Sequence, residues 1–78
     1  MKCIVNLSSN LQIGLASTFV QLANWFSTEI HITKRERRVN AENIMGLLSL
    51  VVARGEAIDL SGTDRDSDEA IQTLGIFL

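Results

Sequence analysis

The sequence Asn40-Ala41-Glu42-Asn43-Ile44-Met45-Gly46-Leu47-Leu48-Ser49-Leu50 is the most informative stretch of this 78-residue chain. Asn43 is a good helix N-cap, because its side-chain oxygen can accept a hydrogen bond from an unpaired backbone N–H group. The residues after it predict a short helix that runs to Leu50, and Gly55 is the expected helix stop. Leu47 and Leu50 are expected in the core. Three further residues form an apolar tip, which is either core or an exposed docking surface: Ile44, Met45 and Leu48.

Before this stretch, the hydrophobic pattern changes period twice. Residues 1–7 alternate, with Met1, Cys3, Val5 and Leu7 on one face, which predicts a strand. From Ile13 to Phe26 the apolar residues recur at helical spacing: Ala16, Phe19, Val20, Ala23 and Phe26. Residues 28–33 alternate again, and a basic turn leads to a short strand at residues 38–40. The chain thus begins strand, helix, strand, strand.

After the stretch, residues 57–60 predict a strand and residues 62–66 a polar turn in which Asp64 or Asp66 caps the last helix. Apolar residues recur along that helix: Ala70, Ile71, Leu74, Phe77 and Leu78. The order is βαββαβα. It predicts one domain, residues 1–78, of the α+β class, with a four-stranded antiparallel sheet and three helices on one face.

Composition excludes several classes of protein. The net charge of −2 argues against general nucleic-acid binding. One Cys and one His cannot build an ordinary zinc site, so no metal and no cofactor are expected. Cys3 reads as a small core residue, and His31 as a surface residue. No apolar run is long enough for a membrane span, and no secretory leader is recognisable, so a cytoplasmic protein is expected.

The chain resembles the HPr family of small phosphocarriers of the bacterial sugar phosphotransferase system, including its catabolite-repression form, Crh. The segments that carry the resemblance are Phe19-Val20-Gln21, Ala23-Asn24, Phe26, Val39-Asn40-Ala41, Ile44-Met45-Gly46-Leu47 and Ser49-Leu50. The resemblance spans nearly the whole chain. It implies an open-faced β-sandwich.

The family's phosphoryl-accepting site is altered. HPr proteins carry the phosphoryl group on a His at the start of the first helix, in a motif that reads Gly-Leu-His-x-Arg-Pro-Ala. Here Gln12 stands at the His position, and an amide nitrogen is not a nucleophile at neutral pH. Gly14 replaces the Arg and Leu15 the Pro. Crh also carries Gln at this position but keeps the Arg-Pro pair, so this chain departs further from the family pattern.

The second family site is altered too. HPr and Crh of Gram-positive bacteria present a Ser at the start of the second helix, where a kinase modifies it. Asn43 stands there, and it caps a helix as well as Ser does but has no hydroxyl. Ser49 is the nearest hydroxyl, and it aligns with a family serine that is not the kinase target.

These residues predict a non-enzymatic, protein-binding regulatory paralogue, a monomer or weak homodimer. The resemblance implies that it binds partners, enzyme I or a transcriptional regulator among them, through the first helix and the apolar tip. The candidate contact residues are Gln12, Ile44, Met45 and Leu48, with Trp25 as a further candidate. One alternative is a working phosphocarrier with an unrecognised acceptor. Another is nucleic-acid binding through the basic turn at residues 34–38, although such charges usually protect a sheet edge.

Overall fold

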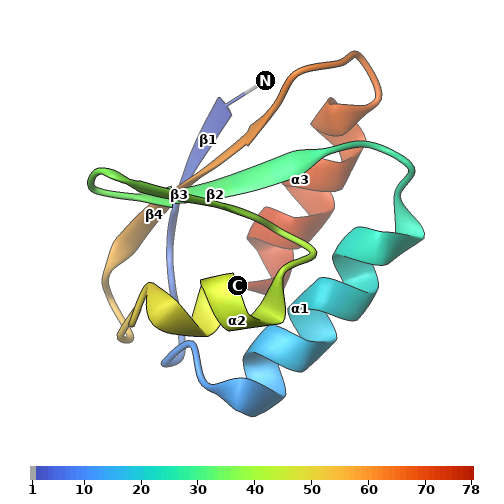
Figure 1. Cartoon of the computed structure of the whole chain (residues 1–78). Coiled ribbons are helices and arrows are strands. Elements are labelled where there is room, and N and C mark those ends of the chain that lie inside the picture. Colours follow the sequence, from blue (N-terminus) through green and yellow to red (C-terminus); the bar gives the residue numbers. More distant parts are fainter. Residues whose placement is uncertain (1) are drawn as a thin grey trace.

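The computed structural model describes residues 2–78, so Met1, predicted in the first strand, lies outside the described residues. The elements follow the predicted order (Figure 1): β1 (Lys2–Asn6), α1 (Ile13–Trp25), β2 (Ile30–Lys34), β3 (Arg37–Asn40), α2 (Ile44–Ser49), β4 (Ala57–Gly62) and α3 (Ser67–Phe77). The βαββαβα prediction is therefore confirmed for this part of the chain.

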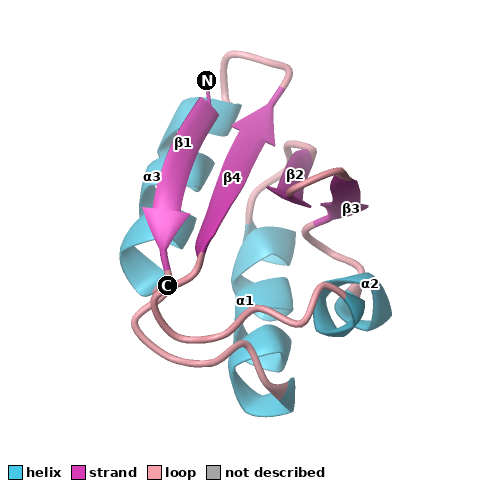
Figure 2. Cartoon of the chain, turned by 90° about the vertical axis from the view of Figure 1, so that its left-hand side faces the viewer, coloured by secondary structure: helices cyan, strands magenta, loops and turns pink. Residues whose placement is uncertain are grey.

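The four strands form one antiparallel sheet in the order β1-β4-β2-β3. β4 lies between β1 and β2, with Val5 opposite Ile58 and Ile32 opposite Leu60. β2 and β3 form a tight hairpin. The helices lie on one side of the sheet (Figure 2), which confirms the α+β open-faced sandwich. β1 and β3 are the two edge strands.

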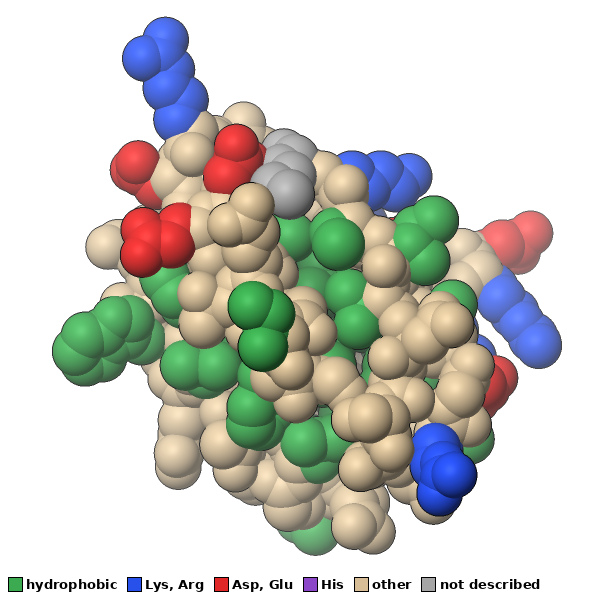
Figure 3. Space-filling model, turned by 180° about the vertical axis from the view of Figure 1, so that it is seen from behind, with side chains coloured by type: hydrophobic (Ala, Val, Ile, Leu, Met, Phe, Trp, Pro, Cys, Tyr) green, Lys and Arg blue, Asp and Glu red, His purple; other side chains and the backbone are tan. Residues whose placement is uncertain are grey.

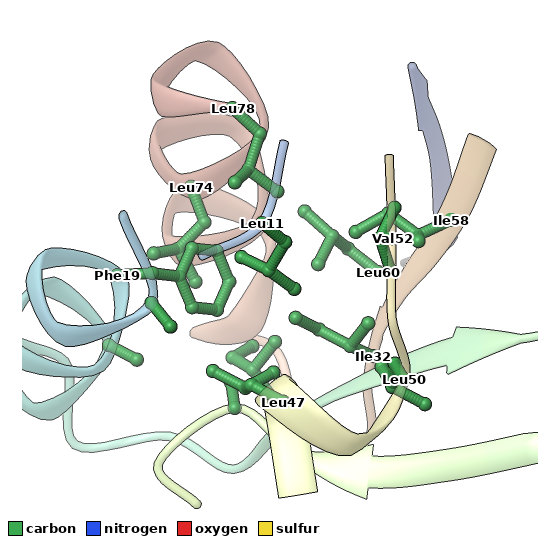
Figure 4. Packing of buried hydrophobic residues seen from close by; sticks show 14 of the residues in the cluster. Leu11, Phe19, Ile32, Leu47, Leu50, Val52, Ile58, Leu60, Leu74 and Leu78 are labelled. Atoms are coloured by element: carbon green, nitrogen blue, oxygen red, sulfur yellow. The ribbon is translucent and has the colours of Figure 1, made fainter. Parts of the chain in front are cut away.

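The core lies between the sheet and the helices (Figure 4). Phe19 of α1 and Leu74 of α3 are fully buried, and they meet Ile32 and Leu60 from the central strands, which are 1% and 0% exposed. The helical stripe and the strand alternation were thus read correctly. Leu47 and Leu50 are buried as predicted. The inward residues of β1, Cys3 and Val5, are only partly buried because β1 lies at the edge of the sheet.

The end of α2 differs from the prediction. The helix ends at Ser49, with Leu50 at the C-cap position, and the left-handed residue that follows is Val51, at φ 52°. Gly55 also has a positive φ, but it lies in the turn before β4, where its N–H donates to the Leu7 carbonyl at 2.8 Å. Gly55 as the helix stop was therefore wrong. The left-handed conformation that usually follows a helix at a glycine is adopted here by Val51, a β-branched residue.

The start of α3 differs as well. Asp66 occupies the N-cap position, but its side chain makes no capping hydrogen bond. The Asp64 carboxylate instead accepts a hydrogen bond from the Thr28 hydroxyl at 2.6 Å, and the Asp64 carbonyl accepts one from the Ser67 hydroxyl at 2.7 Å. The prediction that an aspartate side chain caps this helix was wrong. Asp64 joins the start of β2 to the start of α3.

Candidate functional site

The start of α1 is open and makes few side-chain interactions. Gln12 is exposed at the N-cap position, in extended conformation (φ −114°, ψ 177°), and its side chain makes no capping hydrogen bond. Only its backbone is engaged, with its carbonyl accepting from the Ala16 N–H at 2.8 Å. A Cβ added at Gly14 would meet no atom within 4 Å. This helix start therefore presents backbone N–H groups and an amide, without an imidazole or a guanidinium.

The start of α2 is capped by its side chain, as predicted. Asn43 Oδ1 accepts a hydrogen bond from the Gly46 N–H at 3.0 Å. A Cβ at Gly46 would come within 3.1 Å of Asn43 Nδ2 and 3.2 Å of Val39 Cβ, so the small residue leaves room for the cap. Asn40 supports the turn by accepting from the Glu42 N–H at 2.9 Å. The amide of Asn43 is thus part of the local fold.

Backbone hydrogen bonds join the loop before α1 to the segment after α2. The Leu11 N–H donates to the Val52 carbonyl at 2.8 Å. The Arg54 N–H donates to Asn10 Oδ1 at 2.7 Å. α1 and α2 also pack against each other. Gln12 therefore lies at the start of the helix that packs against α2, the helix that Asn43 caps.

Several apolar side chains on α1, on α2 and directly after α2 are exposed or half-buried. Met45 is 74% exposed, whereas Ile44 and Leu48 are half-buried. Two more residues were not foreseen: Ile13, 68% exposed in the first turn of α1, and Val51, 73% exposed just after α2. Ile13 lies three residues before Ala16, at the helical spacing of the buried stripe, so the pattern along the chain carried no signal of its exposure. We call these residues, with Gln12, the α1–α2 surface: Gln12, Ile13, Ile44, Met45, Leu48 and Val51.

Trp25 lies away from this surface. It is the last residue of α1 and is 82% exposed, so it does not cover the edge of the core. With a rise of 1.5 Å per residue, the 13-residue helix places it roughly 20 Å from Gln12. Trp25 instead borders a hollow between the end of α1 and the start of α3, beside Arg65 and Asp66. Gln12 and Trp25 therefore stand at opposite ends of α1, and a partner that touches both must span this helix.

The basic hairpin, residues 34–38 between and including parts of β2 and β3, forms hydrogen bonds with the C-terminal end of α2. Lys34 Nζ donates to the Val51 carbonyl at 2.6 Å and forms an ion pair with Glu56 at 3.2 Å. Arg37 donates to the Ser49 carbonyl at 2.8 Å and to the Ser49 hydroxyl at 2.9 Å. These cations lie where the helix dipole is negative. A purely solvated hairpin was therefore an incomplete reading, since two of its cations bind backbone carbonyls.

Glu56 links this end of α2 to the chain before β4. The Ala53 N–H donates to its carboxylate at 2.7 Å. This backbone hydrogen bond, followed by the hydrogen bond from Lys34, lowers the pKa of Glu56 below its ordinary value of 4.5. The shift marks a carboxylate that is stabilised in its charged form by the fold. It gives no sign of proton-transfer chemistry.

The described residues add no further chemical centre. His31 is half-buried on β2, where Nδ1 lies 3.2 Å from an Arg38 guanidinium nitrogen. Within residues 2–78, His, Cys, Asp and Glu form no cluster of three or more that could hold a metal ion. In the same part of the chain, no helix is long and apolar enough to cross a membrane.

Known proteins match both the sequence and the fold. Residues 1–78 match the family described as "PTS HPr component phosphorylation site". The HPr-like protein Crh of Halalkalibacterium halodurans is 43% identical over 74 residues, which cover 95% of this chain and 88% of that protein.

Two solved structures are similar over nearly the full length. Phosphocarrier protein HPr from Bacillus anthracis is 35% identical, with a TM-score of 0.92 over 100% of this chain and 95% of that one. Bacillus subtilis Crh, described as a swapped, intertwined dimer, is 38% identical, with a TM-score of 0.80 over 94% of this chain and 84% of that one. The chain therefore belongs to the HPr family of the phosphotransferase system, which includes both the phosphocarriers and Crh.

Proposed function

We propose that this chain is a protein-binding regulatory member of the HPr family that does not carry a phosphoryl group at either family position. The exposed Gln12 at the start of α1 is the main support. Attack on phosphorus needs a free lone pair, and the lone pair of an amide nitrogen is delocalised into its carbonyl. With Gly14 in the place of the arginine, the guanidinium that would clamp the phosphoryl oxygens is also missing.

The start of α2 supports the same proposal. Asn43 supplies the capping oxygen that a serine would supply, at 3.0 Å from the Gly46 nitrogen. It has no hydroxyl to which a kinase could add charge. The cap thus stabilises α2 although this position cannot be phosphorylated, so the charge of the docking region does not change there.

The α1–α2 surface supports a protein partner. Met45, Ile13 and Val51 expose large apolar side chains on neighbouring elements. Apolar side chains grouped in this way mark protein–protein contacts more often than small-molecule sites. We propose that the chain binds its partner here, without catalysing a reaction, in the cytoplasm. Enzyme I and the transcriptional regulator of the family are the partners to test first.

The phosphate part of the proposal is tested by incubation with phosphoenolpyruvate and purified enzyme I. Intact-protein mass spectrometry should show no added phosphoryl group, whereas an HPr phosphocarrier in a parallel reaction becomes labelled. Stable labelling on any residue would contradict the proposal. It would support the alternative, a phosphocarrier with an unrecognised acceptor.

The docking part is tested with two matched variants. Met45 and Trp25 are 74% and 82% exposed, so aspartate at either position leaves the core intact. Pull-down from the native cytoplasm, followed by titration with each purified partner, should show binding weakened more than tenfold by Met45→Asp and unchanged by Trp25→Asp. If Met45→Asp binds as well as the original chain, the α1–α2 surface is not the docking surface.

Self-association is a separate part of the proposal. The relative from Bacillus subtilis is described as an intertwined dimer. We propose that this chain is a monomer that forms a weak homodimer at high concentration.

A further inference from the structure

The two edges of the sheet differ in how they are protected from pairing. β3, at one edge, carries the exposed Arg37 and Arg38. β1, at the other edge, reads Lys-Cys-Ile-Val-Asn, so Lys2 is its one charged residue. Charged side chains keep edge strands from pairing with other strands, whereas an edge strand with few charges leaves its backbone groups open to pairing. The edge formed by β1 is therefore the one open to another strand.

The backbone of β1 shows which residues are available. The Leu7 N–H donates to the Glu56 carbonyl at 3.0 Å, toward the β4 side. Successive residues of an antiparallel strand direct their N–H and C=O groups to opposite sides. Cys3 and Val5 therefore pair with β4, and Lys2, Ile4 and Asn6 direct theirs outward. β1 pairs with no other described strand, and Figure 2 shows its outer side open.

Apolar surface adjoins this edge on both faces. Ile4, on the open face of the sheet, is 72% exposed. On the helix side, Cys3 and Val5 border a hollow of about 470 Å³, together with Gly75 and Ile76 of α3, and Ile76 is 88% exposed. Figure 3 shows hydrophobic side chains gathered on the side of the molecule that carries β1 and α3, with charged residues toward its margins.

We propose that two copies of this chain associate edge to edge through β1, antiparallel, about a two-fold axis at Ile4. This inference specifies the surface of the weak self-association proposed above and is independent of the docking and phosphate proposals. The axis places Ile4 opposite the partner's Ile4, and Lys2 opposite the partner's Asn6. It is the register that pairs all three residues whose backbone groups point outward.

A second copy fits this edge better than an unrelated strand does, because β1 is complementary to itself. The one cation of each strand, Lys2, meets a neutral asparagine, and the two lysines lie at opposite ends of the interface. The two Ile4 side chains meet on the open face. On the helix side, Cys3 lies opposite the partner's Val5, so the two apolar hollows adjoin. A closed two-fold contact uses the same patch twice and leaves no β1 edge free.

Sedimentation equilibrium over a wide range of concentration tests the association. The original chain should show a weight-average mass that rises toward the dimer. Ile4→Lys should weaken dimerisation at least tenfold, because it places two ammonium groups face to face at the axis. Met45→Lys is the matched control, since Met45 is 74% exposed against 72% for Ile4, and it should dimerise as the original chain does.

Crosslinking tests the register. In a Cys3→Ser background, Ile4→Cys should form a disulfide-linked dimer, because residues in a hydrogen-bonded antiparallel pair have Cα atoms about 5.5 Å apart. Lys2→Cys is the control. The two copies of position 2 lie at least about 14 Å apart in the proposed register, at roughly 3.4 Å per residue along the strand, so they should not crosslink.

Three results would overturn the proposal. They are a chain that stays monomeric at millimolar concentration, a dimer unaffected by Ile4→Lys, and crosslinking through position 2 as efficient as through position 4. The second would point to an intertwined dimer or another surface. Because Met45 and Ile4 lie on different elements, none of these outcomes bears on docking through the α1–α2 surface.

Discussion

The starts of α1 and α2, which the proposal places at the two phosphorylation positions of the HPr family, differ in how their first residues are held. Asn43 retains the helix cap, accepting from the Gly46 N–H at 3.0 Å. Gln12 makes no capping hydrogen bond, and Gly14 beside it has open space around it. The start of α2 therefore has a side-chain cap, whereas the start of α1 has none.

The difference has a physical reason. α1 is held by residues on either side of Gln12: Leu11 is 8% exposed, and its N–H bonds to Val52, while Ala16 is fully buried. Gln12, Ile13 and Gly14 between them are exposed, so these three residues can change without loss of core packing. α2 has six residues, too few to be stable without support, so its cap contributes directly. The start of α2 is therefore expected to be more sensitive to substitution than the start of α1.

The comparison predicts that chemistry can be restored at the start of α1. The double variant Gln12→His/Gly14→Arg should accept a phosphoryl group from enzyme I, taking labelling from none to most of the chains. The space at Gly14 accommodates the arginine, and the N–H groups of the helix start stabilise the new anion. Intact-protein mass spectrometry under alkaline conditions detects the acid-labile product.

Gly14→Arg alone is the control for this experiment and should stay unlabelled. A folded double variant that enzyme I does not label would show that more than these two side chains has been lost from the site.

The next effect is on stability. Asn43→Ala should lower the free energy of unfolding by about 1 kcal/mol, because it removes the cap of α2. Gln12→Ala should change it by less than about 0.5 kcal/mol, because no cap exists there. Urea unfolding of both variants, with Asn43→Ser as the variant that retains the cap, measures the difference. Equal losses at the two positions would refute the contrast drawn between the two helix starts.

The far end of α2 extends the comparison. Val51 is held at φ 52°, a conformation that is unfavourable for a β-branched residue. Val51→Gly should therefore raise the free energy of unfolding by about 0.5–1 kcal/mol, because glycine adopts this conformation without strain. Val51→Ala keeps the Cβ and should give at most a small gain. Thermal unfolding of the three proteins decides the matter, and a Val51→Gly variant less stable than Val51→Ala would contradict the prediction.

The smallest expected effect is a pH dependence of stability that comes from the Glu56 carboxylate, near the C-terminal end of α2. The Ala53 N–H and Lys34 hold the pKa of Glu56 below 4.5, so its stabilising contribution is complete above pH 4.5 and is lost as the pH falls through the lowered pKa. Glu56→Gln should therefore be less stable than the original chain at neutral pH, and the two should converge in strong acid. Urea midpoints at several pH values follow this change. A gap that persists at about pH 2 would assign the effect to packing instead.

Much of the fold could be predicted from the sequence, because local periodicity indicates which face of a helix or strand is buried. The spacing of Ala16, Phe19 and Ala23 predicted α1, and the alternation of Ile30 and Ile32 predicted β2; all five residues are buried. The cap at Asn43 was also predictable, because it depends on residues within one turn. The resemblance to the HPr family supplied the topology that the alternating pattern left open.

The errors fell where residues distant in the sequence meet. Asp64 was assigned to a local cap, but it bonds to Thr28, 36 residues away. The basic hairpin was read as a solvated edge, but Lys34 and Arg37 bind the end of α2. Local sequence rules cannot foresee such contacts, because a polar side chain has several partners of equal chemistry and the fold selects among them.

The sequence by itself determined the order and type of the elements, and that the amide side chains of Gln12 and Asn43 offer neither an imidazole nucleophile nor a hydroxyl. These follow from side-chain chemistry and local periodicity, which do not depend on distant residues. The tertiary structure alone decided which apolar residues are exposed. It left Met45 and Trp25 exposed, added Ile13 and Val51 to the α1–α2 surface, and left β1 as the sheet edge with a single charged residue. Exposure depends on which surfaces the packed elements cover, and a pattern along the chain does not contain that information.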